Sequence, residues 1–538
     1  MPFPGNHCPN LLESAIVPFS GDFMNAKIRA WGGLAAMLVL TSNPAFADTA
    51  TEAQVIVHAD RPGAVIHPEI YGQFAEQLGH GIYGGIWVGE DSPIPNIKGY
   101  RKDVVEALKA LKVPVIRWPG GCFADQYNWR DGIGPRDKRP VRMNASWGGE
   151  DSNQFGTHEF MDFAELIGAK AYLSINVGTG SPREMSQWIE YITADGHSSL
   201  AQERRANGRD KPWKLDYVGI GNEMWGCGGS MRPQFYADVY RQYATFVHAP
   251  IVRIASGANS DDVGWTDTVM SIAGSQIDAI SLHNYTIPTG DWSHKGSATQ
   301  FGEGEWISTL QGALRMDDLL TRHSAVMDKY DPKKRVGLDV DEWGNWMDQD
   351  PGAGDAALYQ QNSLRDALSA AITLDIFQAH ADRVRMANIA QMVNVLQAMI
   401  LTDKSKMVLT PTYYVFDMYK VFQNATYLPV DVQAPAYRYG NVSVPGIRAT
   451  AGRDAAGVVH VALVNLDPHH ADTVRMTLPG VHQSNVRGRV LTASDINAIN
   501  TFDHPWQVKP ASFGGATFKH GMVTAVLPPK SVVVLDLY

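Results

Sequence analysis

The sequence predicts an α/β fold in which a (β/α)8 TIM barrel is followed by a jelly-roll-like β-sandwich. Eight short β-type segments alternate with amphipathic segments between residues 70 and 395, and this number of units fits such a barrel. Beyond residue 405 the pattern changes to short strands separated by Gly, Pro and Asp, which is typical of a sandwich. A doubly wound sheet is disfavoured because no Gly-x-Gly-x-x-Gly follows the first predicted strand.

The elements are justified in chain order by their hydrophobic patterns. The amphipathic stretches between strands predict outer helices, and one of them starts with Ser181 at the N-cap and Pro182 at the first helical position. A strand "AQVIVH" from Ala53 precedes the barrel and is expected to complete the sandwich. The predicted domains are an N-terminal strand region 49–66, a barrel 67–405 and a sandwich 406–538. The predicted barrel strands are 70–75, 113–118, 171–177, 217–223, 253–259, 277–285, 335–343 and 386–395.

The first 47 residues are expected to lie outside the mature protein. Residues 24–47 have a basic start with Lys27 and Arg29, a short apolar stretch and a small-x-small end, which together predict a signal peptide. The apolar stretch is too short to span a bilayer as a mature helix. Residues 1–23 are turn-rich and unpatterned, and we interpret them as an extension from a mis-assigned start codon. A secreted or periplasmic protein is therefore expected.

The composition limits the possible partners. The chain has 46 Lys+Arg against 56 Asp+Glu and a pI of about 5.9, so it lacks the basic excess that nucleic acid or an anionic membrane selects. Three cysteines exclude a disulfide framework. Cys122 and Cys227 each follow a predicted strand in a glycine-rich turn, and the sequence leaves open whether they pair or simply fill those turns. No zinc-ligand spacing occurs, so neither a metal nor another cofactor is expected.

Polar and aromatic side chains stand at almost every predicted strand end, where a (β/α)8 barrel carries its active site. A purely structural barrel needs no such set, so a simple structural salt bridge is the weaker interpretation of the carboxylate at the end of strand four. The residues at the strand ends are Glu76, Arg117, Cys122, Asp125, Asn176, Asn222, Glu223, His283, Tyr285, Asp341, Glu342, Trp346 and Gln391.

Glu223 and Glu342 end strands four and seven, so two carboxylates are expected to face each other across one mouth. Glycoside hydrolysis requires such a pair, with one group to protonate the leaving oxygen and one to attack or to activate water. Asn222 is placed to bond a sugar hydroxyl. Apolar faces on which sugar rings can pack are expected on Trp225, Trp343 and Trp346.

Several segments resemble the α-L-arabinofuranosidases of glycoside hydrolase family 51. They include "FAEQLGHGIYGG", "RWPGGCFADQYNWRDGIGPRDKRP", "GNEMWGCGGSM", "SLHNYT", "DEWGNW" and "ANIAQMVNVLQAMI", which follow one another along the barrel. The resemblance implies that Glu223 is the general acid/base and Glu342 the nucleophile. It also implies a retaining, exo-acting enzyme on arabinoxylan, arabinan or their oligosaccharides, and a possible homo-oligomer. The implied substrate-binding positions are Glu76, Cys122, Asn222, His283, Tyr285, Trp346 and Gln391.

One position departs from the family pattern, and two alternative functions stay open. Some members carry Asn where this chain has Cys122, so a thiol or backbone contact would replace the side-chain amide. The first alternative is an endo-acting β-glucanase or xylanase of the same barrel clan, which needs a cleft open at both ends. The second is a non-catalytic carbohydrate-binding protein. Two opposed carboxylates argue against it, because a binder has no need of them.

Overall fold

The computed structural model describes residues 51–538 except 352, 355–356, 482–484 and 520. The predicted signal peptide at 24–47 and the predicted extension at 1–23 lie outside the described residues. Within the described part of the chain, every helix is too short or too polar to cross a bilayer.

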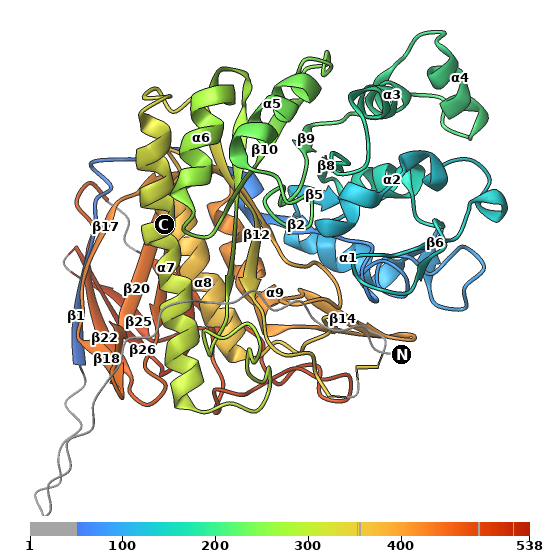
Figure 1. Ribbon diagram of the computed structural model, residues 1–538. Coiled ribbons are helices and arrows are strands. Elements are labelled where there is room, and N and C mark those ends of the chain that lie inside the picture. Colours follow the sequence, from blue (N-terminus) through green and yellow to red (C-terminus); the bar gives the residue numbers. More distant parts are fainter. Residues whose placement is uncertain (1–50, 352, 355–356, 482–484, 520) are drawn as a thin grey trace, which may run out of the picture. The chain divides into compact units, whose positions relative to one another are not determined.

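Eight parallel strands close into a barrel, which Figure 1 shows ringed by helices. All eight predicted barrel strands are confirmed, although the last one ends at Ile389, six residues before its predicted end at Val395. They follow one another around the barrel in chain order, and the last strand pairs with the first. The strands are β2 Gly72–Phe74, β5 Val115–Trp118, β8 Lys170–Ile175, β9 Tyr217–Ile220, β10 Val252–Asn259, β11 Ala279–Thr286, β12 Gly337–Asn345 and β13 Val384–Ile389.

The helices cover the barrel with their apolar faces. The predicted start of α3 is confirmed, because Ser181 Oγ accepts a hydrogen bond from the Glu184 N–H and Pro182 occupies the first turn. In α8 every residue from Leu364 to Gln378 is buried, since this helix contacts both the barrel and the sandwich. The helices are α1 Lys102–Leu111, α2 Thr157–Ile167, α3 Pro182–Thr193, α4 Ser199–Ala206, α5 Pro233–Ala244, α6 Val263–Ala273, α7 Glu303–Asp328, α8 Leu364–Ala379 and α9 Pro411–Tyr419.

Two sheets form the sandwich, and the predicted N-terminal strand belongs to it. β1 Thr51–Val57 pairs antiparallel with β17 and parallel with β22. One sheet has the order β17-β1-β22-β26-β25 and the other β16-β20-β21-β27-β23-β24. The remaining strands are β16 Thr426–Leu428, β17 Val430–Gln433, β20 Ile447–Arg453, β21 Val459–Asn465, β22 Asp472–Thr477, β23 Val486–Leu491, β24 Ala511–Ser512, β25 Ala516–Lys519, β26 Met522–Leu527 and β27 Ser531–Leu537.

Four small hairpins and six short 3-10 helices complete the described fold. The hairpin β6/β7 holds part of the loop between β5 and α2, beside the barrel mouth. Helix α9 was not predicted, because it lies in the region where strand patterns dominate. The predicted domain boundaries stay a prediction. The hairpin strands are β3 Asn96–Ile97, β4 Tyr100–Arg101, β6 Arg142–Met143, β7 Glu150–Asp151, β14 Ile400–Asp403, β15 Lys406–Leu409, β18 Ala436–Tyr439 and β19 Val442–Pro445.

Candidate active site

Glu342 lies near the end of β12, and both of its oxygens are held by donors. Arg117 Nη1 donates to Oε1 at 2.8 Å, and the Tyr285 hydroxyl donates to Oε2 at 2.8 Å. The side chain is 8% exposed. Gly121 comes so close that a Cβ there would lie 2.8 Å from Glu342 Oε1, so a larger residue cannot replace it without displacing the carboxylate.

Glu223 lies in the turn that follows β9. Its φ of 43° is in the left-handed region, which a non-glycine residue adopts only where its surroundings enforce it. The carboxylate accepts a hydrogen bond at Oε1 from His283 Nδ1 at 2.9 Å. One oxygen of Glu223, one oxygen of Glu342 and one ring nitrogen of His283 lie within 4.8 Å of one another. The two predicted carboxylates therefore face each other.

His283 connects the pair to a third carboxylate. Its Nε2 lies 3.0 Å from Asp341 Oδ1, and Tyr172 donates to the other Asp341 oxygen at 2.6 Å. Burial by itself lowers the pKa of His283, but the carboxylates of Glu342 and Asp341 outweigh burial and raise it to about 10. The ring is therefore an imidazolium at neutral pH, and both nitrogens donate hydrogen bonds.

Arg117 is the second cation of the site and is only 1% exposed. Besides Glu342, its guanidinium donates to Asn222 Oδ1 at 2.6 Å and to Ser174 Oγ at 3.1 Å. The guanidinium lies over the Phe74 ring, 4.6 Å from the centroid. Because each of its three guanidinium nitrogens donates a hydrogen bond, Arg117 holds the Glu342 carboxylate and the Asn222 side-chain amide in fixed positions.

Glu76 accepts hydrogen bonds on both oxygens. Trp147 Nε1 and two backbone N–H groups of the turn after β5 donate to Oε1 at 2.9 to 3.1 Å, and Gln391 Nε2 donates to Oε2 at 3.0 Å. Burial, followed by the charge of Glu342, raises the pKa of Glu76 to about 7. Asp125 holds the backbone of Asn222, because Asp125 Oδ2 accepts the Asn222 backbone N–H at 3.1 Å.

Aromatic rings line one side of the site. Trp346 packs edge-on against Tyr285 at 5.0 Å between centroids and against Trp292 at 5.4 Å. The expectation that Trp343 offers a face to a sugar is wrong, because this ring is buried behind the barrel wall against Phe377. Neighbouring residues on a strand point to opposite sides, so Glu342 faces the mouth and Trp343 does not. Trp225 is half-buried and packs on the barrel core.

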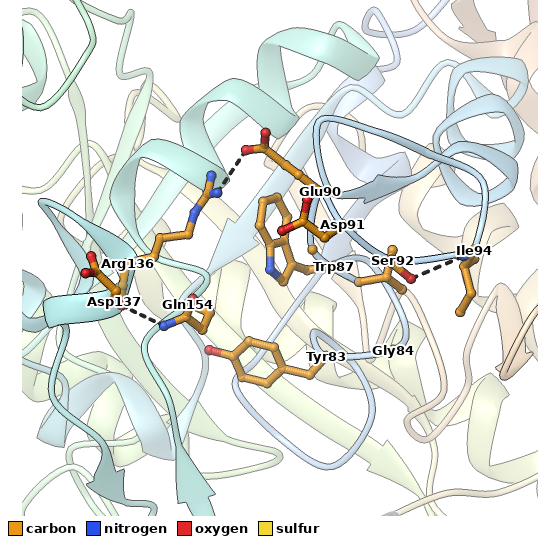
Figure 2. A pocket seen from close by; sticks show the side chains of 12 residues that line it. Tyr83, Gly84, Trp87, Glu90, Asp91, Ser92, Ile94, Arg136, Asp137 and Gln154 are labelled. Carbon is orange, nitrogen blue, oxygen red and sulfur yellow. Dashed lines mark hydrogen bonds and ion pairs between the residues drawn. The ribbon is translucent and has the colours of Figure 1, made fainter.

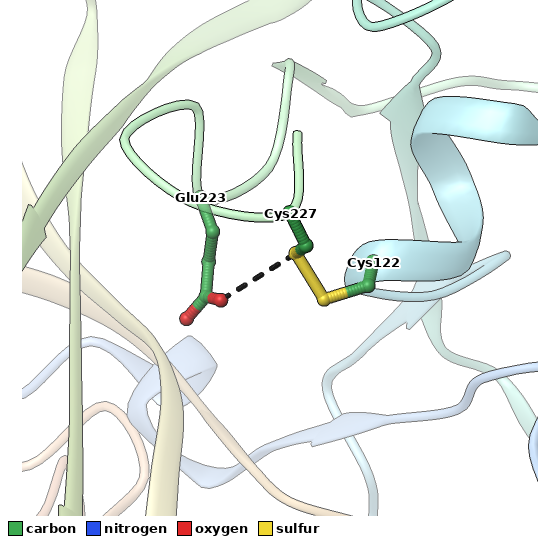
Figure 3. Close-up of side chains that lie close together, drawn as sticks. All are labelled: Cys122, Glu223 and Cys227. Atoms are coloured by element: carbon green, nitrogen blue, oxygen red, sulfur yellow. Dashed lines mark hydrogen bonds between the residues drawn. A yellow bond between two sulfur atoms is a disulfide. The ribbon is translucent and has the colours of Figure 1, made fainter. Parts of the chain in front are cut away.

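The two cysteines that the sequence left open are joined in a disulfide. Cys122 begins the short 3-10 helix after β5, and Cys227 lies in the turn after β9. Figure 3 shows the bridge beside the Glu223 carboxylate. Cys227 Sγ lies 3.6 Å from Glu223 Oε2. Cys122 is half-buried and Cys227 is exposed.

Among the described residues, two groups have ligand-type atoms close enough for a metal ion. One group is Glu223, His283 and Glu342, and the other is Cys122, Glu223 and Cys227. The sulfurs of the second group are bonded to each other, and metal ligation requires thiolates. In the first group the imidazole lies between carboxylates that it already bonds. The absence of a metal requirement stays a prediction.

Two hollows share Tyr83, and the smaller one reaches a residue of the site. The smaller, of about 420 Å³, is lined by Trp147, which also bonds Glu76. The larger, of about 830 Å³, is lined by residues including Trp87, Glu90 and Arg136, and Figure 2 shows their side chains. None of the nine predicted site residues lines either hollow.

The structure brings all nine predicted site residues to one end of the barrel and adds others. Arg117, Asp125 and Asp341 were noted as strand-end residues, but their bonds to the site were not predicted. Tyr172 and Trp147 were missed. The signal for Tyr172 is its position on a predicted strand, whereas Trp147 lies in a loop whose sequence carries no such signal.

The chain is similar to proteins of known activity over most of its length. Two family models match: "Alpha-L-arabinofuranosidase 1 domain" over residues 107–300 and "Alpha-L-arabinofuranosidase C-terminal domain" over residues 341–531. An intracellular exo-alpha-L-arabinofuranosidase of Bacteroides ovatus is 51% identical over 491 residues, which are 90% of this chain and 95% of that protein.

Solved structures agree with these matches. The GH51 arabinofuranosidase from Xanthomonas axonopodis pv. citri is 54% identical with a TM-score of 0.90, and the match covers 91% of this chain and 100% of that one. An alpha-L-arabinofuranosidase from Thermotoga maritima, solved as an arabinose complex, is 33% identical with a TM-score of 0.80 and coverages of 90% and 99%.

The parallel barrel is closed, two carboxylates face each other at its mouth, and the chain matches known arabinofuranosidases. These features together define a glycoside hydrolase. The chain belongs to glycoside hydrolase family 51, the α-L-arabinofuranosidases.

The prediction of a secreted or periplasmic protein is wrong. It is contradicted by the Bacteroides ovatus relative, which is 51% identical and is named as an intracellular enzyme. The prediction depended on residues 24–47, which lie outside the described residues. A basic start and a short apolar stretch form a signal of few residues, and composition alone can produce it.

Proposed function

We propose that the chain is a retaining, exo-acting α-L-arabinofuranosidase that works by double displacement. The observation that carries this proposal is the closeness of the pair, since an oxygen of Glu223 and one of Glu342 lie within 4.8 Å of each other. Retaining glycosidases hold the two carboxyl groups about 5 to 5.5 Å apart, whereas inverting ones need about 6.5 to 9.5 Å to admit a water. The separation supports retention.

Glu342 is the proposed nucleophile. Arg117 and Tyr285 each donate to one of its oxygens, and these two hydrogen bonds hold the carboxylate in one orientation. The carboxylate attacks the anomeric carbon of the arabinosyl unit, and the leaving oxygen departs from the opposite face. The covalent glycosyl-enzyme that results keeps the sugar in place for the second step.

Glu223 is the proposed general acid and base. His283 occupies Oε1, so Oε2 is the oxygen that carries the proton to the leaving group. In the second step the same oxygen removes a proton from water, which attacks the glycosyl-enzyme. Because both displacements invert the anomeric centre, the product has the configuration of the substrate.

The arabinosyl unit has three kinds of partner in this proposal: an amide donor, a carboxylate acceptor and an apolar ring. The Asn222 Oδ1 is used by Arg117, which leaves its amide nitrogen to donate. Glu76 accepts from sugar hydroxyls, and its carboxylate is oriented by Gln391 and Trp147. Trp346, beside Tyr285, supplies an apolar edge.

The sugar that carries the arabinosyl unit is proposed to extend toward the smaller hollow. That hollow measures about 420 Å³ and is lined by Trp147, which donates a hydrogen bond to Glu76. Arabinoxylan, arabinan or their oligosaccharides are the proposed substrates, because relatives that match most of the chain are named as arabinofuranosidases. The absence of nucleic-acid and membrane partners, and assembly into a homo-oligomer, stay predictions.

The test separates the proposal from an endo-acting enzyme and from a binding protein. The chain should release the phenol from an aryl α-L-arabinofuranoside, and it should release arabinose from arabinoxylan without lowering the viscosity of the polymer. A rapid fall in viscosity with little free arabinose would favour the endo-acting alternative. No release from either substrate would favour a protein that only binds sugars.

A further inference from the structure

The disulfide between Cys122 and Cys227 links two turns that carry different parts of the catalytic machinery. The cysteines are 105 residues apart in the sequence and come from the turns after β5 and β9. The turn after β9 contains Glu223, and the turn after β5 abuts Glu342. The bridge therefore crosses the gap between the two sides of the proposed carboxylate pair.

The turn of Cys227 is hydrogen-bonded to the backbone of Glu223. The Glu223 carbonyl accepts from the Gly226 N–H at 2.7 Å and from the Gly228 N–H at 3.2 Å. These donors stand on either side of Cys227, so a displacement of the cysteine displaces Glu223. The left-handed φ of 43° at Glu223 also depends on this enclosing turn.

The turn of Cys122 is fixed to the other side of the site. The N–H of Gly121, directly before Cys122, donates to Glu76 Oε1 at 3.0 Å. The same glycine approaches Glu342 so closely that a Cβ would lie 2.8 Å from its Oε1. Cys122 thus follows a glycine whose position is fixed beside Glu342, the nucleophile candidate.

The bridge also contacts the reacting carboxylate. Cys227 Sγ lies 3.6 Å from Glu223 Oε2, whereas His283 bonds the other oxygen, Oε1. Figure 3 shows the bridge beside this carboxylate. A disulfide sulfur has no proton, so it cannot donate to Oε2. A free Cys227 thiol would carry a proton at the same place and could hold the carboxylate in the wrong orientation.

We infer that the Cys122–Cys227 disulfide is a positioning element for Glu223, and that the chain with two free thiols is a slower enzyme. This inference rests on the proposed roles of Glu223 and Glu342. The cysteines act through Glu223 and do not react with the sugar. Cys227 is exposed, so a small thiol reaches the bridge, and exposed disulfides are commonly the labile ones.

The interconversion is an ordinary thiol–disulfide exchange with a small dithiol. One thiolate of the reductant attacks one sulfur of the bridge, and the mixed disulfide is then resolved by the second thiol of the reductant. The two cysteine sulfurs gain two electrons and two protons, and the dithiol becomes a cyclic disulfide. An added disulfide oxidant reverses the exchange.

The experiment compares the bridged and reduced chain on substrates with different leaving groups. An alkyl α-L-arabinofuranoside needs a proton from Glu223, whereas a dinitrophenyl α-L-arabinofuranoside does not. Reduction should lower the turnover of the alkyl substrate by about 10- to 100-fold, as expected for a misplaced catalytic group. The initial burst of dinitrophenolate should be unchanged, and azide should restore its steady-state rate by replacing the activated water.

Variants separate the bridge from other effects of the dithiol. A Cys122→Ala/Cys227→Ala double variant should behave like the reduced chain with or without the dithiol. The third cysteine supplies the matched control, because a Cys8→Ser variant should respond to reduction and reoxidation as the native chain does. Circular dichroism and the thermal midpoint of each form establish that the chain stays folded.

Three results would overturn the inference. They are equal turnover of the alkyl substrate in both redox forms, an equal loss in alkyl turnover and in the dinitrophenolate burst, and a loss of the dinitrophenyl steady-state rate that azide does not relieve. An equal loss would mean that the bridge supports only the fold. If instead the bridged chain itself hydrolyses no arabinofuranoside while staying folded, the proposed function fails, and the positioning role fails with it.

Discussion

Two arginine–glutamate pairs with nearly the same contacts lie in different surroundings. At the barrel mouth Arg117 Nη1 is 2.8 Å from Glu342 Oε1, and its guanidinium lies 4.6 Å from the centroid of the Phe74 ring. In the larger hollow Arg136 Nη1 is 2.9 Å from Glu90 Oε1. Its guanidinium lies 4.7 Å from the centroid of an indole ring.

The difference between the pairs is burial. The side chains of Arg117 and Glu342 are 2% and 8% exposed, whereas those of Arg136 and Glu90 are 37% and 54% exposed. Water screens the exposed pair, and such pairs contribute about 0 to 1 kcal/mol. Removal of one partner from a buried pair leaves an uncompensated charge and costs about 3 to 5 kcal/mol. Contact geometry alone therefore does not identify a functional pair.

The largest expected effect is the loss of the buried glutamate. Glu342→Gln removes the proposed nucleophile and should lower kcat/KM for an aryl α-L-arabinofuranoside by on the order of 10⁴-fold. The matched variant Glu90→Gln changes the exposed pair and should leave kcat/KM unchanged. Steady-state kinetics on both purified variants checks this, and comparable losses in the two would remove the distinction between the pairs.

The next effect concerns the two arginines and is measured as stability. Arg117→Met should lower the free energy of unfolding by about 3 to 5 kcal/mol, because Glu342 and Asp341 lose a buried cation. Arg136→Met should cost at most about 1 kcal/mol, since its other partner Glu159 keeps Arg139. Denaturant unfolding of the two variants measures both losses. A larger loss in the free energy of unfolding for Arg136→Met than for Arg117→Met would contradict the burial argument.

The next prediction concerns the pH dependence of the buried imidazolium. The pKa of His283 in the folded protein is raised from 6.5 to about 10 by the surrounding carboxylates, against the effect of burial. The stabilisation from this cation is complete below pH 6.5 and is lost as the pH rises through about 10. The thermal midpoint of the native chain should therefore fall more steeply between pH 7 and 10 than that of His283→Gln.

The control for the pH experiment is a histidine at the surface. His469 is 57% exposed and pairs with Glu303, so His469→Gln should keep the pH dependence of the native chain. Parallel curves for the native chain and His283→Gln would mean that His283 is not an imidazolium in the folded protein.

The smallest expected effect is that of a chelator. The ligand-type atoms around Glu223 already have protein partners, so prolonged dialysis against a chelator should leave kcat and KM unchanged. Restoration of a lost activity by added zinc or calcium would refute the prediction.

The sequence could predict the barrel and the carboxylate pair because both depend on local patterns. Short apolar runs that end in a charged residue, such as the run before Glu223, mark strands whose ends meet at one mouth. The expectation for Trp343 was wrong because an apolar run does not show which of its side chains face the mouth. That becomes known only when the side of one residue on the strand is known. Once Glu342 faces the mouth, its neighbour cannot.

Other parts of the site could not be predicted because they depend on tertiary distances. Trp147 reaches Glu76 only through the path of a hairpin loop. The disulfide requires two turns 105 residues apart to come within bonding distance, and local composition contains no such information.

The configuration of the azide product in two variants tests the central claim most directly. Glu223→Ala should still form the glycosyl-enzyme from a dinitrophenyl α-L-arabinofuranoside, and azide should then give the α-azide, with the configuration retained. In Glu342→Ala azide replaces the missing carboxylate and should give the inverted β-azide. Proton NMR of the two products distinguishes them. The same anomer from both variants, or the inverted azide from Glu223→Ala, would contradict the assignment of Glu342 as nucleophile and Glu223 as acid and base.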